Sequence, residues 1–387
     1  MNDDRPYWLA WSRINGVGPR LVQQLVVEFG TLEEAWWATS TALRTVPGIG
    51  PKLLETISEA RSHLDPDQLL EDCDRSGIQF WIAADPDYPR LLLEIPSPPP
   101  VLYYRGVVDG AENRGEKAAI AIVGTRNLTD YGRRWTAQLS THLSQHQFTI
   151  VSGMAAGVDT IAHEACLRAG GRTLAVLGTG VDVVYPKSNR RLYEQIQTQG
   201  LILSDYPPGT PPEARNFPPR NRIIAGLSRA VLVMEAAQRS GALITARYGA
   251  EFNRDVYSLP GSLDQPQSLG CLELVNNGAQ LILGVKPLLE ALGEIPHLDL
   301  PGGQLSLELL NPSAAIAPPL IPTAVTPPPD LDPLLKQVWE ATPLEPTPLD
   351  VIMATTGLPI SELSPALSQL ELLDLVIQLP GMQYRRS

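Results

Sequence analysis

Short apolar runs separated by helix-like patterns constrain the fold of this chain more than any other feature. Six of them follow one another between residues 111 and 290: Ile120–Val123, Thr149–Val151, Thr173–Leu177, Leu201–Ser204, Val231–Met234 and Asp255–Ser258. A continuous apolar run indicates a strand buried on both faces, as in a parallel sheet covered by crossover helices. We therefore predict a Rossmann-like α/β fold for this region, with ligands bound beyond the carboxyl ends of the strands.

Small and polar residues follow several of these runs, at the edge where a ligand is expected. The turns are Gly124-Thr125-Arg126, the stretch that runs from Ser152 and Gly153 to Gly157, and Ser240-Gly241 followed by Thr245. Glycine lets the backbone approach an anion, helix N-termini present N–H groups to it, and Arg126 adds charge. Lys187 lies in a cluster of cations at the same rim, residues 186–191. A phosphate contact and an ordinary solvated helix start are equally good interpretations of that cluster.

The stretch Asn216–Ser228 adds an aromatic residue and two arginines. It contains Phe217, Arg220, Asn221 and Arg222. The arginine fork suits phosphate oxygens, and an aromatic ring beside it can stack on a nucleobase. Taken alone, the stretch is explained equally well as a loop with solvated arginines and a buried phenylalanine.

Taken together and in this order, these motifs resemble the DprA (Smf) family of DNA-processing proteins. The resemblance extends from about residue 5 to the C-terminus and is densest over residues 118–261. It implies a protein that protects incoming single-stranded DNA and loads RecA recombinase onto it during natural transformation or recombination. It also implies a homodimer joined through the central domain. In this interpretation Arg126, Arg220 and Arg222 hold successive phosphates, Phe217 stacks on a base, and Asn221 orients the loop or bonds a base edge.

The charge distribution agrees with a nucleic-acid partner although the total does not. The formal net charge is −12. Residues 116–261, however, hold 16 Lys and Arg against 11 Asp and Glu, a charge of +5, whereas the rest of the chain holds 14 against 31, a charge of −17. A basic middle between acidic ends is expected of a local phosphate-binding surface.

Enzymatic alternatives lack their usual motifs. Gly178 and Gly180 are not followed by a third glycine at the dinucleotide-binding spacing, and no phosphate-binding P-loop occurs. Asp159 and Glu235 have no histidine, metal ligand or second acid beside them in the sequence, so we interpret both as structural. We predict no catalytic residue, cofactor or metal. A nucleotide-binding or nucleoside-monophosphate-cleaving enzyme on a related fold is the alternative.

Five segments are expected along the chain. Residues 1–75 form a helical domain with two helix-hairpin-helix-like turns (a SAM-like arrangement), and 76–110 form a lead-in extension. Residues 111–290 form the Rossmann-like domain, 291–332 a Pro-rich linker and 333–387 a winged-helix-like domain. The would-be recognition helix of the last domain contains no Lys or Arg, which favours a protein-contact or regulatory role. No apolar run is long enough to span a membrane, and a cytoplasmic protein is expected.

Overall fold

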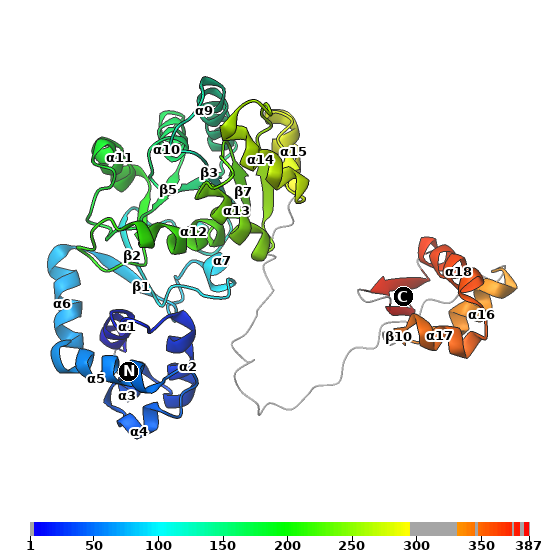
Figure 1. Cartoon of the computed structure of the whole chain (residues 1–387), viewed down its shortest axis with the longest axis horizontal. Coiled ribbons are helices and arrows are strands. Elements are labelled where there is room, and N and C mark those ends of the chain that lie inside the picture. Colours follow the sequence, from blue (N-terminus) through cyan, green and yellow to red (C-terminus); the bar gives the residue numbers. More distant parts are fainter. Residues whose placement is uncertain (1–3, 295–330, 345–346, 374, 380–382, 387) are drawn as a thin grey trace. The chain divides into compact units, whose positions relative to one another are not determined.

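The structure is a computed structural model that describes residues 4–294, 331–344, 347–373, 375–379 and 383–386. It contains two compact units, residues 1–303 and 304–387 (Figure 1). Most of the predicted Pro-rich linker, residues 295–330, lies outside the described residues. Within the described ranges, none of the helices is both long and apolar enough to cross a membrane.

The chain begins with helices α1 (Arg5–Ser12), α2 (Pro19–Phe29), α3 (Leu32–Trp37), α4 (Ser40–Leu43), α5 (Pro51–His63) and α6 (Pro66–Ser76). Two glycine turns precede α2 and α5, with Gly16 at φ 90° and Gly48 at φ 97°. A positive φ favours glycine, and the proline that opens each of the two helices has the φ that a first helical position needs. Inside this part, Trp11 and Trp36 pack edge to face with their ring centroids 5.5 Å apart.

A nine-stranded sheet follows, in the order β1-β2-β6-β5-β4-β3-β7-β8-β9. Its strands are β1 (Gln79–Ile82), β2 (Val101–Gly106), β3 (Ala119–Val123), β4 (Thr149–Ser152), β5 (Thr173–Val176), β6 (Leu201–Ser204), β7 (Ala230–Val233), β8 (Asp255–Ser258) and β9 (Gln280–Leu281). The seven strands from β6 to β9 are parallel, whereas β1 and β2 extend the sheet with antiparallel pairing. The predicted Rossmann-like class is confirmed.

Helices cover both faces of the sheet (Figure 1). They are α7 (Arg90–Leu93), α8 (Gly110–Asn113), α9 (Asp130–Gln145), α10 (Val158–Arg168), α11 (Arg190–Gln199), α12 (Phe217–Gly226), α13 (Ala242–Glu251), α14 (Pro266–Asn276) and α15 (Val285–Glu294), with 3-10 turns at Lys187–Asn189 and Ala214–Asn216. Ile120 and Ile122 of β3 pack toward α9 and α10, whereas Ala121 and Val123 pack toward α12 and α13. Successive side chains of a strand point to opposite faces of the sheet, so a strand that is buried on both faces is apolar at every position.

The order of the strands creates a switch point between β3 and β7. From β3 the chain winds outward through β4, β5 and β6, and it then returns to the other side of β3 to form β7, β8 and β9. The connections that follow β3 and β7 therefore diverge to opposite sides of the sheet. In open α/β sheets the crevice outside the carboxyl ends of two such strands is the usual place for a ligand.

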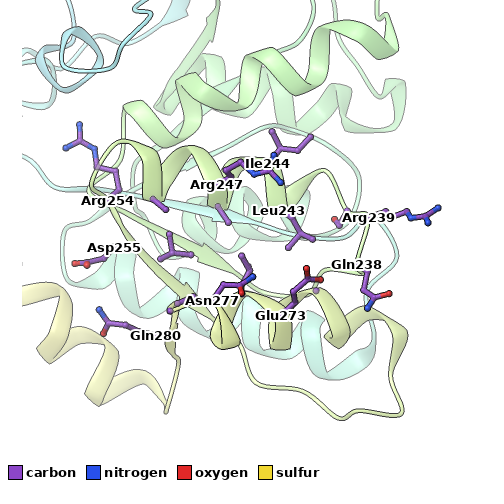
Figure 2. A pocket seen from close by; sticks show the side chains of 18 residues that line it. Gln238, Arg239, Leu243, Ile244, Arg247, Arg254, Asp255, Glu273, Asn277 and Gln280 are labelled. Carbon is purple, nitrogen blue, oxygen red and sulfur yellow. The ribbon is translucent and has the colours of Figure 1, made fainter.

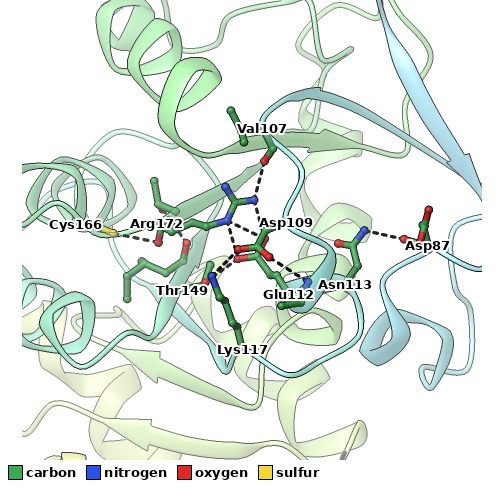
Figure 3. A network of polar contacts seen from close by, with 12 residues as sticks. Asp87, Val107, Asp109, Glu112, Asn113, Lys117, Thr149, Cys166 and Arg172 are labelled. Carbon is green, nitrogen blue, oxygen red and sulfur yellow. Dashed lines mark hydrogen bonds and ion pairs between the residues drawn. The ribbon is translucent and has the colours of Figure 1, made fainter.

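At the opposite edge of the sheet, where the parallel strands begin, charged side chains form ion pairs (Figure 3). We call this the amino edge. The Glu112 carboxylate lies 2.9 Å from the Arg172 guanidinium and also accepts a hydrogen bond from the Thr149 hydroxyl at 2.7 Å. Lys117 and Asp109 form a second pair at 2.6 Å. These contacts tie the segment before β3 to the starts of β4 and β5.

The second unit comprises α16 (Pro333–Ala341), β10 (Thr347–Pro348), α17 (Leu349–Thr356), α18 (Ile360–Leu372), β11 (Val376–Leu379) and β12 (Gln383–Arg386). The three strands form an antiparallel sheet in the order β10-β12-β11. Helices followed by a β-hairpin form a winged helix, as predicted. The α18 helix is the one expected to act as a recognition helix, and it contains no Lys or Arg.

Candidate functional site

A cleft of about 640 Å³ lies at the switch point. Nine of the residues predicted from the sequence line it: Gly124, Thr125, Arg126, Phe217, Arg220, Asn221, Ser240, Gly241 and Thr245. They come from the loop after β3, the start of α12 and the start of α13. Ser152, Gly153, Gly157, Lys187 and Arg222 are not part of its lining. The structure thus brings together segments that are far apart in the sequence and leaves five predicted residues outside this lining. One of the five, Gly153, lines a smaller recess beside Phe217.

Arg126 and Phe217 form the open part of the cleft. The Arg126 side chain is exposed, and its guanidinium carbon lies 5.9 Å from the centre of the Phe217 ring. No acidic side chain pairs with Arg126 among the residues that the structure describes. Phe217 is half-buried as the first residue of α12. A cation that no carboxylate neutralises, next to a partly exposed ring, is suited to bind a phosphate and a base together.

A second aromatic residue beside Phe217 was missed in the sequence. The Tyr185 ring centroid lies 5.5 Å from that of Phe217, and both side chains line a recess of about 80 Å³ that also includes Arg126. Gly178 makes this arrangement possible, because a Cβ there would lie 2.8 Å from the Phe217 ring. The only sequence signal was an aromatic residue a few positions after the Gly178-Thr179-Gly180 turn.

Arg220 is a buried internal side chain, which differs from the phosphate contact inferred from the sequence. Its guanidinium donates hydrogen bonds to the carbonyl oxygens of Gly153, at 3.0 Å, and Val176. Burial lowers the pKa of Arg220 to about 10, and the nearby Asp159 acts in the opposite direction. The group therefore remains charged at neutral pH. The difference arises because α12 already begins at Phe217, so Arg220 lies within the helix on its inward face.

Asp159 lies beneath the cleft. Its carboxylate accepts hydrogen bonds from the backbone N–H groups of Gly153, at 3.1 Å, and Ala155, at 3.2 Å. Burial raises the pKa of Asp159, while Arg220 and the two amides lower it. The two amides of this glycine turn are thus directed toward a carboxylate of the protein, and the Gly153 carbonyl of the same turn accepts the hydrogen bond from Arg220.

Arg222 is also engaged within the protein. Its guanidinium lies 2.9 Å from the carboxylate of Asp205, and the two side chains are 12% and 14% exposed. Asp205 directly follows β6, on the side of the sheet away from β7. The pair fixes α12 to the end of β6. Two of the three arginines predicted to hold phosphates therefore have partners inside the protein.

The remaining small residues determine how the loops pack. Gly157 has φ 93°, and a Cβ there would lie 2.4 Å from the carbonyl oxygen of Thr125. The backbone N–H of Val158 donates to that same oxygen at 3.2 Å. Ser152 is fully buried, and its hydroxyl donates to the Ile122 carbonyl at 2.6 Å. Gly157 thus lets the loops after β3 and β4 approach each other, and Ser152 joins the ends of the two strands.

The N-terminus of α13 opens into the cleft. The Ser240 hydroxyl accepts a hydrogen bond from the Ala242 N–H at 3.3 Å, and the Asn221 amide donates to the Gly241 carbonyl at 3.2 Å. Asn221 therefore joins α12 to α13. Arg239, which precedes this turn, is exposed and lines the cleft. A helix N-terminus with an adjacent cation attracts anions.

Lys187 lies just outside the cleft. It is exposed on the 3-10 turn Lys187–Asn189 and directly follows Pro186, which lines the recess beside Phe217. The backbone under it is held by Asn189, whose amide donates to the Met154 carbonyl at 2.9 Å and the Thr160 hydroxyl at 2.8 Å. Lys187 is thus a rim residue on a firmly held turn.

The other titratable groups near the cleft have partners of their own. Glu235 accepts hydrogen bonds from the backbone N–H and the hydroxyl of Thr129, which caps α9. His163 contacts the Thr173 hydroxyl at 2.7 Å, and burial lowers its pKa to about 3, so it is neutral at physiological pH. Across the described ranges, no three His, Cys, Asp or Glu residues are grouped as a metal site would require.

Fold and site together define a Rossmann-like protein with an arginine and an aromatic ring at the switch point of its sheet, and with a separate winged-helix unit. Residues 79–293 match the family described as DNA recombination-mediator protein A, and residues 322–382 match the DprA winged helix domain. The chain therefore belongs to the DprA family.

Three known proteins illustrate the likeness. Protein Smf of Synechocystis is 53% identical, and the match covers 100% of this chain and 99% of that protein. The X-ray structure of DNA processing protein A from Streptococcus pneumoniae is 33% identical, with a TM-score of 0.65 over 75% of this chain and 98% of the other. A structure of the Helicobacter pylori protein, described as giving insight into its single-stranded DNA binding mode, is 30% identical, with a TM-score of 0.50 over 55% of this chain and 95% of the other.

Proposed function

We propose that this protein binds single-stranded DNA in the cleft at the β3–β7 switch point. The observation that carries the proposal is the Arg126–Phe217 pair, an exposed cation next to a half-buried ring at the mouth of the cleft. The binding mode named for the Helicobacter pylori relative supports it. Stacking on an aromatic ring accepts any base, so the proposed binding has little sequence preference.

In this proposal the residues of the cleft divide into two groups. Arg126, Arg239 and the N-terminus of α13 contact phosphates, and Phe217 stacks on a base with Tyr185 beside it. Lys187 at the rim contacts a phosphate as the strand leaves. Arg220, Asn221 and Arg222 act as positioning residues, because their polar groups are bonded to neighbouring segments of the protein. A duplex binds weakly, since its bases are paired and stacked and do not present a face to Phe217.

The biological role that we propose is the one implied by the family resemblance. The protein protects single-stranded DNA in the cytoplasm and loads RecA recombinase onto it during transformation or recombination, without catalysing a reaction itself. A homodimer joined through the α/β region would place two clefts on one strand and raise the apparent affinity without any new contact within each cleft.

One observation favours a second candidate. A cleft of about 640 Å³ is within the size range of sites for small ligands, so a mononucleotide fits it as well. In that case the protein is a nucleotide-binding adaptor or an enzyme that cleaves nucleoside monophosphates. Tight mononucleotide binding with weak oligonucleotide binding, or release of free base, would identify it.

Fluorescence anisotropy with a labelled oligothymidine tests the proposal. The expected result is salt-sensitive binding of the single strand and much weaker binding of the same strand annealed to its complement. Equal binding of the single strand and the duplex would show that Phe217 does not stack on a base. Absence of binding at low and high salt would leave the mononucleotide site as the better explanation.

A further inference from the structure

Two grooves on the α/β region offer paths on which a strand could continue beyond the cleft. One, of about 590 Å³, lies between α13 and α14 and shares Arg239, Ser240 and Ile244 with the cleft (Figure 2). We call it the α13–α14 groove. The other, of about 560 Å³, lies between α10 and α11, and we call it the α10–α11 groove. The charges along their walls differ.

The α13–α14 groove has carboxylates that oppose a polyanion. Arg239 and Arg247 are exposed cations in its lining, but Asp255 and Glu273 also line it (Figure 2). Neither acid forms an ion pair within the part of the chain that the structure describes. Arg254 is already paired with Glu94 at 3.1 Å. A phosphate chain in this groove would therefore pass two carboxylates that no cation neutralises, which costs free energy through like-charge repulsion.

The α10–α11 groove differs because no unpaired carboxylate is in its lining. Arg191 is exposed in its lining and has no acidic partner among the described residues. The one acid in the lining, Glu164, is paired with Arg168 at 3.5 Å. The lining thus has one unpaired cation, Arg191, and no unpaired carboxylate.

The position of Lys187 links this groove to the cleft. On one side of Lys187, Tyr185 and Pro186 line the recess next to Phe217; on the other side, Ser188 and Asn189 line the α10–α11 groove. Lys187 itself is exposed between the two. The two linings therefore adjoin along the chain at Lys187, and this exposed cation is where a phosphate chain would cross from one to the other.

The outer face of α11 has donors along this path. Arg191, Gln195 and Gln199 are spaced four residues apart, which places them in one row on the helix, and all three are exposed in the groove. Leu192 and Ile196 face inward and are buried. The ten residues of α11 span about 15 Å, which matches at most about four phosphates at the 3.4 Å spacing of a stacked strand.

We propose that single-stranded DNA leaving the cleft turns at Lys187 and continues along the α10–α11 groove. Arg191 contacts a phosphate there, and Gln195 and Gln199 donate hydrogen bonds to phosphate or sugar oxygens. The inference rests on the proposed function of the cleft. It predicts that the protein contacts more nucleotides than the cleft alone can hold.

Oligonucleotides of two lengths test this extension: about six thymidines, enough for the cleft, and about twenty, enough for both surfaces. Arg191→Ala is expected to leave binding of the short strand unchanged. For the long strand it is expected to reduce the slope of log K against log salt by about 0.7, the value for one lost phosphate contact on a single strand. When salt is raised from 50 to 200 mM, the affinity for the long strand should therefore fall by a factor that is about 2.6 times smaller in Arg191→Ala than in the unmodified protein.

Two further variants complete the design. Arg247→Ala removes an exposed cation from the α13–α14 groove and is expected to change neither slope, whereas Gln195→Glu adds an anion to the α10–α11 groove and should weaken only the long strand. A length-dependent loss in Arg247→Ala, or none in Arg191→Ala, would overturn the extension while leaving the cleft intact. Failure of the unmodified protein to bind even the short strand would instead reject the proposed function.

Discussion

The two edges of the parallel sheet use the same residue types in different ways. At the amino edge, Arg172 and Lys117 each lie against a carboxylate, Glu112 and Asp109 respectively. At the carboxyl edge, Arg126 is exposed and has no acidic partner within the described residues. Basic residues at the amino edge are therefore paired within the protein, whereas at the carboxyl edge at least one is available to a ligand.

The carboxyl edge itself shows the same contrast on a smaller scale. Arg220 and Arg222 are only two residues apart, yet both are bonded inward, while Arg126 on the neighbouring loop faces the solvent. The lesson is that a count of cations near a cleft does not measure how many can bind phosphate. The hydrogen-bond and ion-pair partners of each cation decide that.

The largest effect is expected from the buried arginine of the cleft. Arg220→Met leaves the buried Asp159 without the nearby positive charge that lowers its pKa. A buried charge without compensation should lower the free energy of unfolding by about 3–5 kcal/mol. The additional change Asp159→Asn should restore part of the loss. Urea unfolding of both variants measures this. If Arg220→Met alone is as stable as the unmodified protein, Arg220 does not stabilise the fold.

At the amino edge, Glu112→Gln tests the closed end of the sheet. The change removes the partner of Arg172 and should reduce stability by about 1.5–3 kcal/mol, the range for hydrogen bonds to charged groups. Binding of single-stranded DNA at a temperature where the variant is folded should be unchanged. A weakened affinity with normal stability would contradict the division of roles between the two edges.

Phe217→Ala is expected to affect binding more than stability. The loss of one stacked base corresponds to about 1–3 kcal/mol of binding free energy. Phe217→Trp keeps an aromatic face and should retain most of the affinity. If the alanine variant binds as tightly as the tryptophan variant in an anisotropy titration, the ring does not stack on DNA.

A smaller effect concerns pH and the buried histidine of α10. Burial lowers the pKa of His163 to about 3 in the folded protein, below its ordinary value of 6.5, so the unfolded chain binds more protons between these values. The contribution of His163 to stability is therefore complete above pH 6.5 and is lost as the pH falls toward 3, by up to about 1.4 kcal/mol per pH unit. Unfolding at pH 7 and pH 5 should show a shallower loss in His163→Gln than in the unmodified protein. Equal losses of stability in the two proteins between pH 7 and pH 5 would show that His163 does not cause this pH dependence.

Much of the fold was predictable because its signals are local. Each fully apolar run, such as Ile120–Val123, needs only its own residues to indicate a strand covered on both faces. The antiparallel additions β1 and β2 were not foreseen as part of the same sheet, because pairing of β2 with β6 joins residues about a hundred positions apart. The winged helix was foreseen from the order of its helices and hairpin.

The site was only partly predictable because the direction of a side chain depends on distant partners. Arg126 could be singled out because it follows a glycine turn at a strand end. Nothing near Arg220 or Arg222 in the sequence reveals that Asp159 and Asp205 lie beside them in the fold. Tyr185 was overlooked for the same reason, since its contact with Phe217 depends on the backbone at Gly178.

The most direct test of the account is the salt dependence of single-stranded DNA binding in Arg126→Ala. Arg44→Ala is the matched control, because Arg44 is also an exposed cation and lies in the N-terminal helical part of the chain. Loss of one phosphate contact should reduce the slope of log K against log salt by about 0.7 in Arg126→Ala, whereas Arg44→Ala should keep the slope of the unmodified protein. Equal slopes of log K against log salt for Arg126→Ala and the unmodified protein would show that Arg126 does not bind phosphate. That result would contradict the proposed binding of DNA at the carboxyl edge.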